Sequence, residues 1–248
     1  MPKCLYGTLI LSAALLFSGC EGADFVFNSV SVHGSGKVIS ENRSIRGIHE
    51  VELSGVGELN LHQGKEESLT VEAEDNLMPR IRTDVEGGRL RIGVERGFSL
   101  RPTTTIRYTL VVRDLTSLEL SGSGKVVSGA LRCSNLAVHL PGSGEIQIDQ
   151  LDADNLDVGI SGSGDIRIPG RVNHQTVRIS GSGHYDGKEL DSQSTEISIS
   201  GSGDSTLWAR DSLTAHISGS GDVAYYGSPR VSKSISGSGE VRSLGSRP

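Results

Sequence analysis

Residues 160–166 read Ile-Ser-Gly-Ser-Gly-Asp-Ile, and this stretch decides the fold because its central tripeptide keeps returning. Gly-Ser-Gly occurs eight times, once from Gly34 and seven times from Gly122, Gly142, Gly162, Gly181, Gly201, Gly219 and Gly237. The later copies are 18 to 20 residues apart, which is too short for a propeller blade or a helical repeat. The spacing therefore predicts one coil of a solenoid for each copy.

Apolar residues flank the copies with the period of two that marks a β-strand. Two residues before the first glycine stand Leu120, Leu140, Ile160, Ile179, Ile199, Ile217 and Ile235. Four residues after it stand Val126, Ile146, Ile166, Tyr185, Ser205, Val223 and Val241. The pattern predicts an all-β fold, a right-handed parallel β-helix or solenoid of 18–20-residue coils. Equivalent residues of successive coils should stack about 4.8 Å apart.

The glycines of the tripeptide are predicted to form the turn between the two strands of each coil, because glycine tolerates positive φ. These structural turn residues are Gly122, Gly124, Gly142, Gly144, Gly162, Gly164, Gly181, Gly183, Gly201, Gly203, Gly219, Gly221, Gly237 and Gly239. The serine between each pair of glycines stacks from coil to coil in this arrangement. We expect its hydroxyl to satisfy backbone groups of the turn rather than to take part in a reaction.

Residues 63–115 lack this rhythm and read as a longer, irregular β segment. Alternating stretches at 68–74 and 89–95 predict strands, and Gly87-Gly88 predicts a tight hairpin turn. Since the open end of a solenoid exposes strand edges, this segment should cap the N-terminal end of the stack. The chain then divides into a lipoprotein signal peptide (1–19), a lipidated N-terminus and tether or first coil (20–44), an irregular N-terminal β part (45–121) and the repeat solenoid (122–248).

The first twenty residues resemble a bacterial lipoprotein signal. Lys3 gives a short positive region, residues 5–17 are mostly apolar, and the stretch ends in Ser18-Gly19-Cys20. Such a signal predicts export, cleavage before Cys20 and lipid on the Cys20 thiol, with the acyl chains holding the protein on a membrane. The alternative is an ordinary secretory signal in which Cys20 occurs by chance. The residue after Cys20 is Glu21 rather than the Asp of an inner-membrane retention signal, which favours the outer membrane.

The charge of the chain argues against one class of partner, and its cysteine content argues against an internal disulfide. The chain has 24 Lys and Arg, 30 Asp and Glu and no run of basic residues, so nucleic acid is not an expected partner. Once residues 1–19 are removed and Cys20 is lipidated, Cys133 is the remaining thiol, and an internal disulfide cannot form. The fold must then rest on packing and backbone pairing.

A family resemblance rests on three motifs that follow one another. Residues 68–74 read SLTVEAE and precede Asp75-Asn76-Leu77, residues 85–90 read Val-Glu-Gly-Gly-Arg-Leu, and Leu or Ile before Ser-Gly-Ser-Gly then repeats. Over residues 45–243 this order resembles the DUF2807 family, also called the putative auto-transporter adhesin, head GIN domain. The resemblance implies a β-solenoid protein of the cell envelope.

One outward column of the predicted stack is acidic. Asp204, Asp222 and Glu240 each follow the tripeptide in three successive coils, about 5 Å apart. Carboxylates at this spacing repel one another, and a bound Ca²⁺ ion would relieve the repulsion. These residues are therefore a candidate metal site that binds Ca²⁺ weakly. The alternative is a solvated edge whose Asp side chains bond to turn amides.

A second outward column, seven residues after the first glycine, holds Pro169, Lys188, Trp208 and Tyr226. Trp208 is the single tryptophan of the chain. Stacked aromatic rings on a solenoid face suit the apolar faces of sugars, so Trp208 and Tyr226 are candidate residues for binding a glycan or another partner. The alternative is that Trp208 covers the edge of the solenoid.

The commoner catalytic signatures are absent: the chain has no G-x-S-x-G, no Walker loop and no H-E-x-x-H. We therefore expect that it is not an enzyme. The sequence predicts a lipid-anchored β-solenoid module of the bacterial cell envelope for adhesion or interaction, with a glycan or protein of the envelope or exterior as its partner. A purely structural envelope scaffold and a β-helix enzyme acting on polysaccharide are the alternatives.

Overall fold

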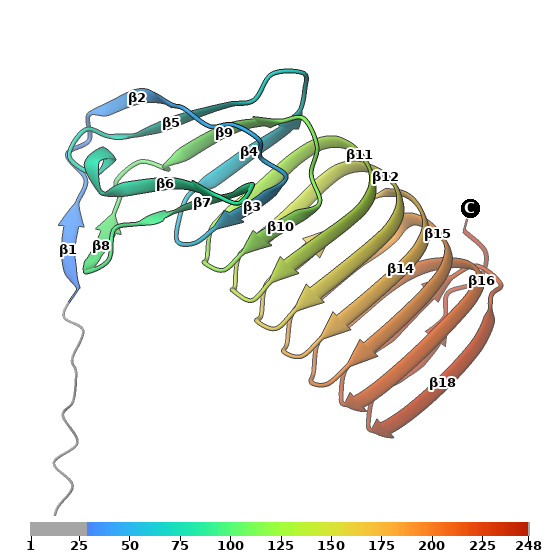
Figure 1. The fold of residues 1–248 in the computed structure, drawn as a ribbon. Coiled ribbons are helices and arrows are strands. Elements are labelled where there is room, and N and C mark those ends of the chain that lie inside the picture. The colour runs from blue at the N-terminus through green and yellow to red at the C-terminus, as the bar shows by residue number, and fades with distance from the viewer. Residues whose placement is uncertain (1–28, 248) are drawn as a thin grey trace, which may run out of the picture.

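A computed structural model describes residues 29–247 of the chain. It is nearly all β and forms a β-solenoid of about six turns, as the repeat predicts. Figure 1 shows the coils following one another from a broader N-terminal part toward the C-terminus. The predicted signal peptide and Cys20 lie outside the described residues. No helix in residues 29–247 has the length and apolar character needed to span a membrane.

The stack of parallel coils is built from short and long strands. Its first coil comes from β3 and β4, and its later coils from β10 to β19. The bounds are β3 Glu50–Leu53, β4 Glu58–Gln63, β10 Ser117–Leu120, β11 Lys125–Leu140, β12 Glu145–Ile160, β13 Asp165–Arg167, β14 Gly170–Ile179, β15 His184–Ile199, β16 Asp204–Gly219, β17 Val223–Tyr226, β18 Arg230–Gly237 and β19 Val241–Ser243.

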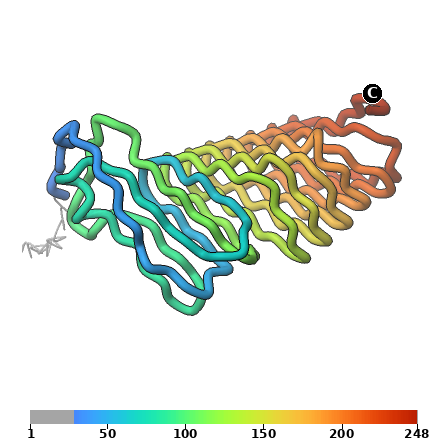
Figure 2. Tube along the Cα trace, turned by 90° about the horizontal axis from the view of Figure 1, so that it is seen from above, coloured from blue at the N-terminus to red at the C-terminus, as the bar shows by residue number. Residues whose placement is uncertain are grey.

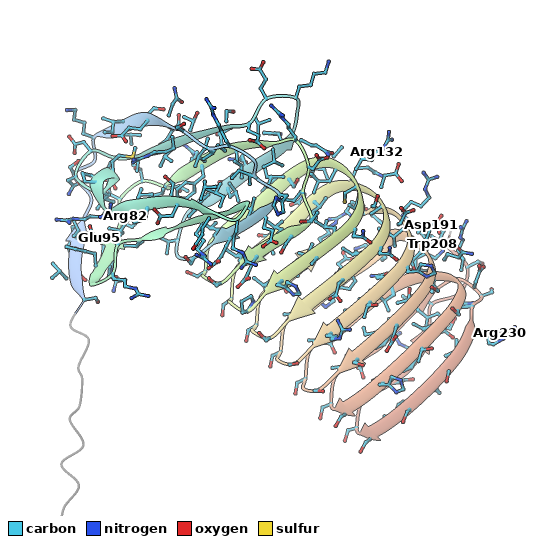
Figure 3. All side chains as sticks on the ribbon, viewed as in Figure 1. Arg82, Glu95, Arg132, Asp191, Trp208 and Arg230 are labelled. Atoms are coloured by element: carbon cyan, nitrogen blue, oxygen red, sulfur yellow. The ribbon has the colours of Figure 1, made fainter. Side chains whose placement is uncertain are left out.

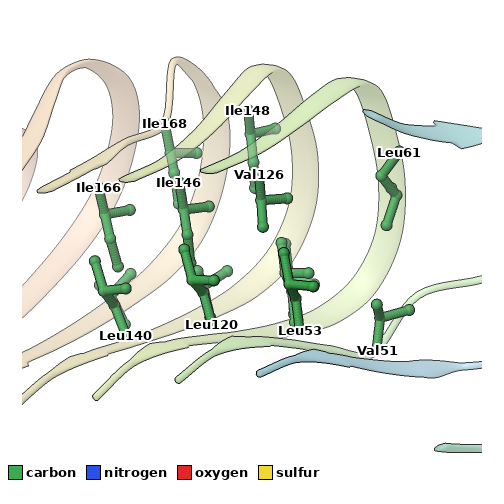
Figure 4. Close-up of a cluster of buried hydrophobic side chains, with 14 of the residues drawn as sticks. Val51, Leu53, Leu61, Leu120, Val126, Leu140, Ile146, Ile148, Ile166 and Ile168 are labelled. Carbon is green, nitrogen blue, oxygen red and sulfur yellow. The ribbon is translucent and has the colours of Figure 1, made fainter. Parts of the chain in front are cut away.

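The register of the stack confirms the predicted core ladders. Leu140, Ile160, Ile179, Ile199, Ile217 and Ile235 are partners in successive coils. Every member of this ladder except Ile235 is buried, and a second ladder from Val126 and Ile146 faces it across the interior of the coil (Figure 4). Because side chains alternate along a strand, one face of each strand fills the core while the other reaches solvent.

The N-terminal part, called the cap below, covers the first coil of the stack. Its elements are β1 Val30–His33, β2 Val38–Arg43, β5 Ser68–Glu74, the short 3-10 helix η1 Met78–Arg80, β6 Ile81–Glu86, β7 Arg89–Val94, β8 Phe98–Arg101 and β9 Arg107–Val112. The β6–β7 hairpin turns at Gly87-Gly88, as predicted, and both glycines have positive φ.

The cap closes the stack by adding one more parallel rung and then antiparallel strands. β7 pairs parallel with β3, and β9 pairs parallel with β4, so this rung lies outside the first coil although it follows that coil in sequence. β6 then runs antiparallel to β7, and β5 runs antiparallel to both β9 and β2. Figure 2 shows the resulting broad end opposite the C-terminus.

The earliest Gly-Ser-Gly copy lies outside the stack. Strand β1 before Gly34 pairs with β8, and strand β2 after it pairs with β5. The variant Gly55-Val56-Gly57 is the turn that belongs to the first coil, because Ser123 N donates to Gly55 O and Lys125 N donates to Gly57 O. Residues 30–43 are therefore part of the cap.

The turn glycines are needed for a different reason from the one the sequence suggested. Of those between residues 122 and 239, all within the described part, only Gly219 and Gly237 have positive φ, at 148° and 135°. At Gly162 a methyl group would lie 1.8 Å from the carbonyl oxygen of Gly142 in the preceding coil. The turns stack so closely that no side chain fits, and this close approach, rather than an unusual φ, requires glycine.

The serines of the turns bond through their backbone and not as predicted through their hydroxyls. Ser143 N donates to Gly122 O at 3.1 Å, and the turns at Ser182, Ser202, Ser220 and Ser238 repeat this bond with the coil before them. The side chains of these serines are exposed on the edge of the stack. Backbone pairing thus continues through the turns as well as along the strands.

Candidate functional site

One outward column runs along most of the stack, from β11 to β17, and combines charged with aromatic side chains. Its members, the edge ladder, are register partners in successive coils: Arg132, Asp152, Arg171, Asp191, Trp208 and Tyr226. Five steps of about 4.8 Å make this ladder about 24 Å long. Figure 3 shows Arg132, Asp191 and Trp208 following one another along a single edge of the stack.

Each position of the edge ladder points outward because its chain neighbours point inward. Asp152 lies between Leu151 and Ala153, and Trp208 lies between Leu207 and Ala209. All four of these apolar neighbours are buried in the core. Strand alternation therefore holds the polar and aromatic side chains at the surface on a rigid backbone, which suits a site that must keep its shape.

Ion pairs connect the charged half of the ladder while leaving its guanidinium groups available. Asp152 bridges Arg132 and Arg171, with one carboxylate oxygen 3.3 Å from each arginine Nη2. The side chains of Arg132 and Arg171 are 83% and 67% exposed. Further along, Asp191 pairs with Arg210 at 3.2 Å. Exposed guanidinium groups keep several donors free for planar, two-point hydrogen bonding to a ligand.

Two adjoining hollows of about 530 and 680 Å³ lie beside the charged half. Arg132, Asp152 and Arg171 line both of them. Gln63, at the end of β4, closes the first hollow: its side chain accepts from Arg132 N at 2.8 Å and donates to Arg132 O at 3.0 Å. Gln63 is the last residue of β4, and the next strand along the chain is β5 of the cap.

The thiol of Cys133 lines the second hollow. Cys133 is a partly buried free cysteine. The prediction that it is the remaining thiol depends on residues 1–20, outside the described part of the chain. Burial raises the pKa of Cys133, and the carboxylates of Asp114 and Asp154 raise it further. Since the thiolate is the reactive form of cysteine, a raised pKa disfavours reaction of this thiol.

The aromatic half of the ladder is half-buried. Trp208 and Tyr226 are direct register partners, as their equal offset from the turn predicted. Arg247 lies over the Trp208 ring, with its guanidinium carbon 4.8 Å from the ring centroid. The rings are therefore neither core residues nor fully free, and the arginine extends the charged character of the ladder over the aromatic surface.

The predicted column around Trp208 was wrong in two members, Pro169 and Lys188, since Arg171 rather than Pro169 represents its coil in this column. Lys188 does not lie beside Trp208, because the pairing of β15 with β16 shifts between Gly187 and Asp191. The coil that starts at Gly201 is 18 residues long against 20 for the one before it, so residues 188–190 have no partner in β16. Lys188 instead pairs with Asp186 at 2.8 Å, and Asp191 takes the place beside Trp208.

The acidic column uses its carboxylates within the fold. Asp204 Oδ1 accepts from Asp222 N, and Asp222 Oδ1 accepts from Glu240 N, each at 2.8 Å. Among residues 29–247 no three His, Cys, Asp or Glu side chains are grouped closely enough to hold a metal ion. Weak Ca²⁺ binding at Asp204, Asp222 and Glu240 stays a prediction, which a thermal shift at millimolar Ca²⁺ would test.

Sequence reasoning found the aromatic half of the ladder and missed the charged half. Arg132 and Asp152 both stand ten residues after the first glycine of their coils, as does Asp191, whereas Arg171 stands nine after it. Alternation of basic and acidic residues at this offset was the available signal. It is obscured because the coils differ in length, so the offset that reaches the edge changes from ten to seven along the stack.

Proteins of known structure share this fold, and a family model matches most of the chain. The family model of DUF2807, described as putative auto-transporter adhesin, head GIN domain, matches residues 48–229. A crystal structure of a putative adhesin from Bacteroides fragilis has a TM-score of 0.82 at 25% identity, covering 86% of this chain and 100% of that chain. A putative lipid binding protein from Parabacteroides distasonis has a TM-score of 0.76 at 26% identity, covering 87% of this chain and 100% of that one.

A putative adhesin from Parabacteroides merdae shares the fold, with a TM-score of 0.66 at 20% identity over 86% of this chain and 99% of that chain. No curated protein matches this chain. The similar proteins named here are described as adhesins or as a lipid binding protein, and none of them as an enzyme. An adhesin-like class points to the cell envelope or the exterior.

Proposed function

Since this chain belongs to the DUF2807 family, the putative auto-transporter adhesin, head GIN domain, we propose that it is a lipid-anchored, non-catalytic adhesion module that binds an extended glycan along the edge ladder. The observation that carries this proposal is the ladder itself. It sets exposed arginines, carboxylates and two aromatic rings in one straight row on a rigid scaffold.

The chemistry of the edge ladder fits a sugar polymer. Sugars present hydroxyl groups around their rims, which arginine and aspartate side chains can bind as donors and acceptors. They also present apolar faces, which stack on aromatic rings such as Trp208 and Tyr226. A row of about 24 Å would engage several sugar units at once, and repeated weak contacts on one rigid face add to useful affinity.

A binding role is favoured over catalysis by the pairing of the charges. Asp152 and Asp191, the carboxylates of the ladder, are both engaged by arginines. A glycosidase needs two carboxyl groups facing each other across the scissile bond, one of them able to hold a proton. In the ladder the two carboxylates stand in the same column with Arg171 between them, so they do not face one another across a substrate.

Attachment to the membrane would come from Cys20. The support is the Ser18-Gly19-Cys20 ending after an apolar stretch. Intact-mass analysis of the chain extracted from membranes tests this part. A mature N-terminus at Cys20 with the added mass of acyl chains is expected, and an unmodified N-terminus elsewhere would contradict it.

The glycan proposal is tested with the soluble chain from residue 21 onward on an array of bacterial and host glycans. Trp208→Ala should lower the affinity for any bound glycan by about tenfold or more, since a buried aromatic anchor is worth about 1–3 kcal/mol. Phe98→Ala is the matched control, because Phe98 also lies under an arginine, Arg80, but on the cap. Equal loss in both variants, or no binding to any glycan by the wild-type chain, would overturn the proposal.

A further inference from the structure

The last coil of the described chain leaves a strand edge unpaired. Strand β18 pairs with β16 only, and β19 pairs with β17 only, within residues 29–247. All eight residues of β18 are exposed, and Figure 1 shows β18 as the outermost strand of its sheet. The backbone N–H and C=O groups on its outer side are available for another strand, which makes this edge a place where an extended chain can add.

The core ladders continue into β18, but there their residues are exposed and one of them is charged. Val231 and Ile235 continue the buried columns of Leu213 and Ile217, yet they are 36% and 38% exposed. Between them stands Lys233, in the column that Val177, Ile197 and Ala215 fill in the preceding coils. The edge thus presents an aliphatic residue, a cation and an aliphatic residue on its core-facing side.

The charge of the molecule reverses at the same place. Residues 230–248 contain four basic residues, Arg230, Lys233, Arg242 and Arg247, and one acid, Glu240, for a net charge of +3. Residues 117–229 contain 7 Lys and Arg against 14 Asp and Glu, for a net charge of −7. A basic end on an acidic stack attracts acidic partners and disfavours another basic end.

We propose that the β18 edge binds an extended acidic polypeptide segment, which adds as one more strand and places a carboxylate beside Lys233. Backbone hydrogen bonds to β18 would supply affinity that does not depend on the partner's side chains. Val231 and Ile235 would be covered by apolar residues two positions on either side of that carboxylate, and the Lys233 ammonium would select it. A second copy of this chain fits less well, because like-charged basic edges would face each other if two copies met end to end at β18.

The test uses the mature chain from residue 21 onward and a dye-labelled peptide of sequence Ser-Val-Thr-Glu-Thr-Ile-Thr, read by fluorescence anisotropy. In the first matched peptide Lys replaces Glu. In the second, Pro replaces the Thr that follows Glu, which removes a backbone N–H donor from the strand pairing. The wild-type chain should bind the Glu peptide and not the other two. Lys233→Glu should weaken binding of the Glu peptide by about fivefold to tenfold. The same variant should bind the Lys peptide, because an acid at position 233 prefers a basic partner.

Lys37→Glu is the control, because Lys37 is an exposed lysine on the cap at the opposite end, and it should leave all three affinities unchanged. Lys233→Gln should fall between wild type and Lys233→Glu, and melting curves verify that each variant is folded. No binding of the Glu peptide, equal binding of all three peptides, or sedimentation showing that the wild-type chain occupies this edge with a second copy would each overturn the proposal. Trp208→Ala should not affect this binding, so failure here is distinguishable from failure of the glycan proposal.

Discussion

The same tripeptide is used in the cap and in the stack for two different physical reasons. In the stack, a methyl group at Gly162 would lie 1.8 Å from the carbonyl oxygen of Gly142, the turn of the previous coil. In the cap, a methyl group at Gly34 would lie 2.0 Å from the carboxylate of Glu74. That carboxylate is completely buried and accepts hydrogen bonds from Gly36 N, Thr103 N and the Thr103 hydroxyl.

The stack and the cap are held in place by different kinds of contact. In the stack every coil is held by a nearly identical neighbour, so a constraint at one turn recurs at every turn. In the cap there is no identical neighbour, and the single buried carboxylate of Glu74, at the end of β5, holds two loops that are far apart in sequence, at Gly36 and at Thr103. Substitutions should therefore have repeated, backbone-level consequences in the stack and local, side-chain-level consequences in the cap.

The largest effect is expected from Ile179→Asp, in the middle of the core ladder. Ile179 is 1% exposed, and an uncompensated buried charge there should cost about 4 kcal/mol or more and unfold the stack. Ile235→Asp is the matched control, since Ile235 continues the same ladder at 38% exposure and should cost about 1 kcal/mol or less. Urea denaturation measures both, and equal destabilisation would show that the end coil is buried.

Gly162→Ala against Gly34→Ala tests the comparison directly. In the stack the obstacle is the backbone of the preceding coil, which cannot move without disturbing the pairing between coils, so we expect a loss of about 3 kcal/mol or more. In the cap the obstacle is the end of the Glu74 side chain, which can shift at the loss of a hydrogen bond, so we expect about 1–2 kcal/mol. A larger loss for Gly34→Ala in thermal melts would mean that the cap, not the stack, is the less adaptable region.

The cap should also respond to acid through Glu74. Hydrogen bonding from the Thr103 hydroxyl, with further bonds from backbone amides, lowers the pKa of Glu74 below its ordinary value of 4.5. A carboxyl whose pKa is lowered on folding stabilises the fold above that ordinary value, and the contribution is lost as the pH falls through 4.5 toward the folded-state value. The protection factors of amides in β2 and β5, taken relative to the intrinsic exchange rate at each pH, should therefore fall in acid.

Glu74→Gln should make these strands less protected at neutral pH, because an amide cannot accept all three bonds, and should flatten their response to acid. Glu86→Gln is the control, since the Glu86 side chain is 82% exposed. Protection in β12 and β14, in the middle of the stack, should be unaffected by Glu74→Gln. An acid response that is the same in wild type and Glu74→Gln would assign it to other carboxyl groups.

The smallest effects are expected at the two arginine–aromatic pairs. Arg247→Ala should cost about 0.5 kcal/mol and increase iodide quenching of Trp208, the single tryptophan of the chain. Arg80→Ala in the cap should cost more, because Arg80 also donates to Glu95 at 2.8 Å as well as lying over Phe98. A Trp208 emission that is already unquenchable in the wild-type chain would place this ring in the core and remove the aromatic half of the edge ladder.

The predictable features are those that repeat or that depend on a few adjacent residues. The ladder through Ile160 and Ile179 follows from period-two placement, and the β6–β7 hairpin follows from Gly87-Gly88. The edge ladder was predicted only at Trp208 and Tyr226, which share one offset. Its charged members were missed because the pairing of Asp191 with Trp208 follows a register shift, and no local sequence pattern predicts that shift.

By itself the sequence determined the solenoid, its coil length and the residues that fill its core, because these depend on spacing along the chain and on the alternation of side chains in a strand. Only the tertiary structure decided that β7 and β9 lie outside β3 and β4, that Glu74 holds Gly34, and that Asp191 stands beside Trp208. Each of these joins segments whose sequence separation or register is set by backbone pairing between coils. Backbone hydrogen bonds can form in many registers, and the packing of the whole molecule selects one of them.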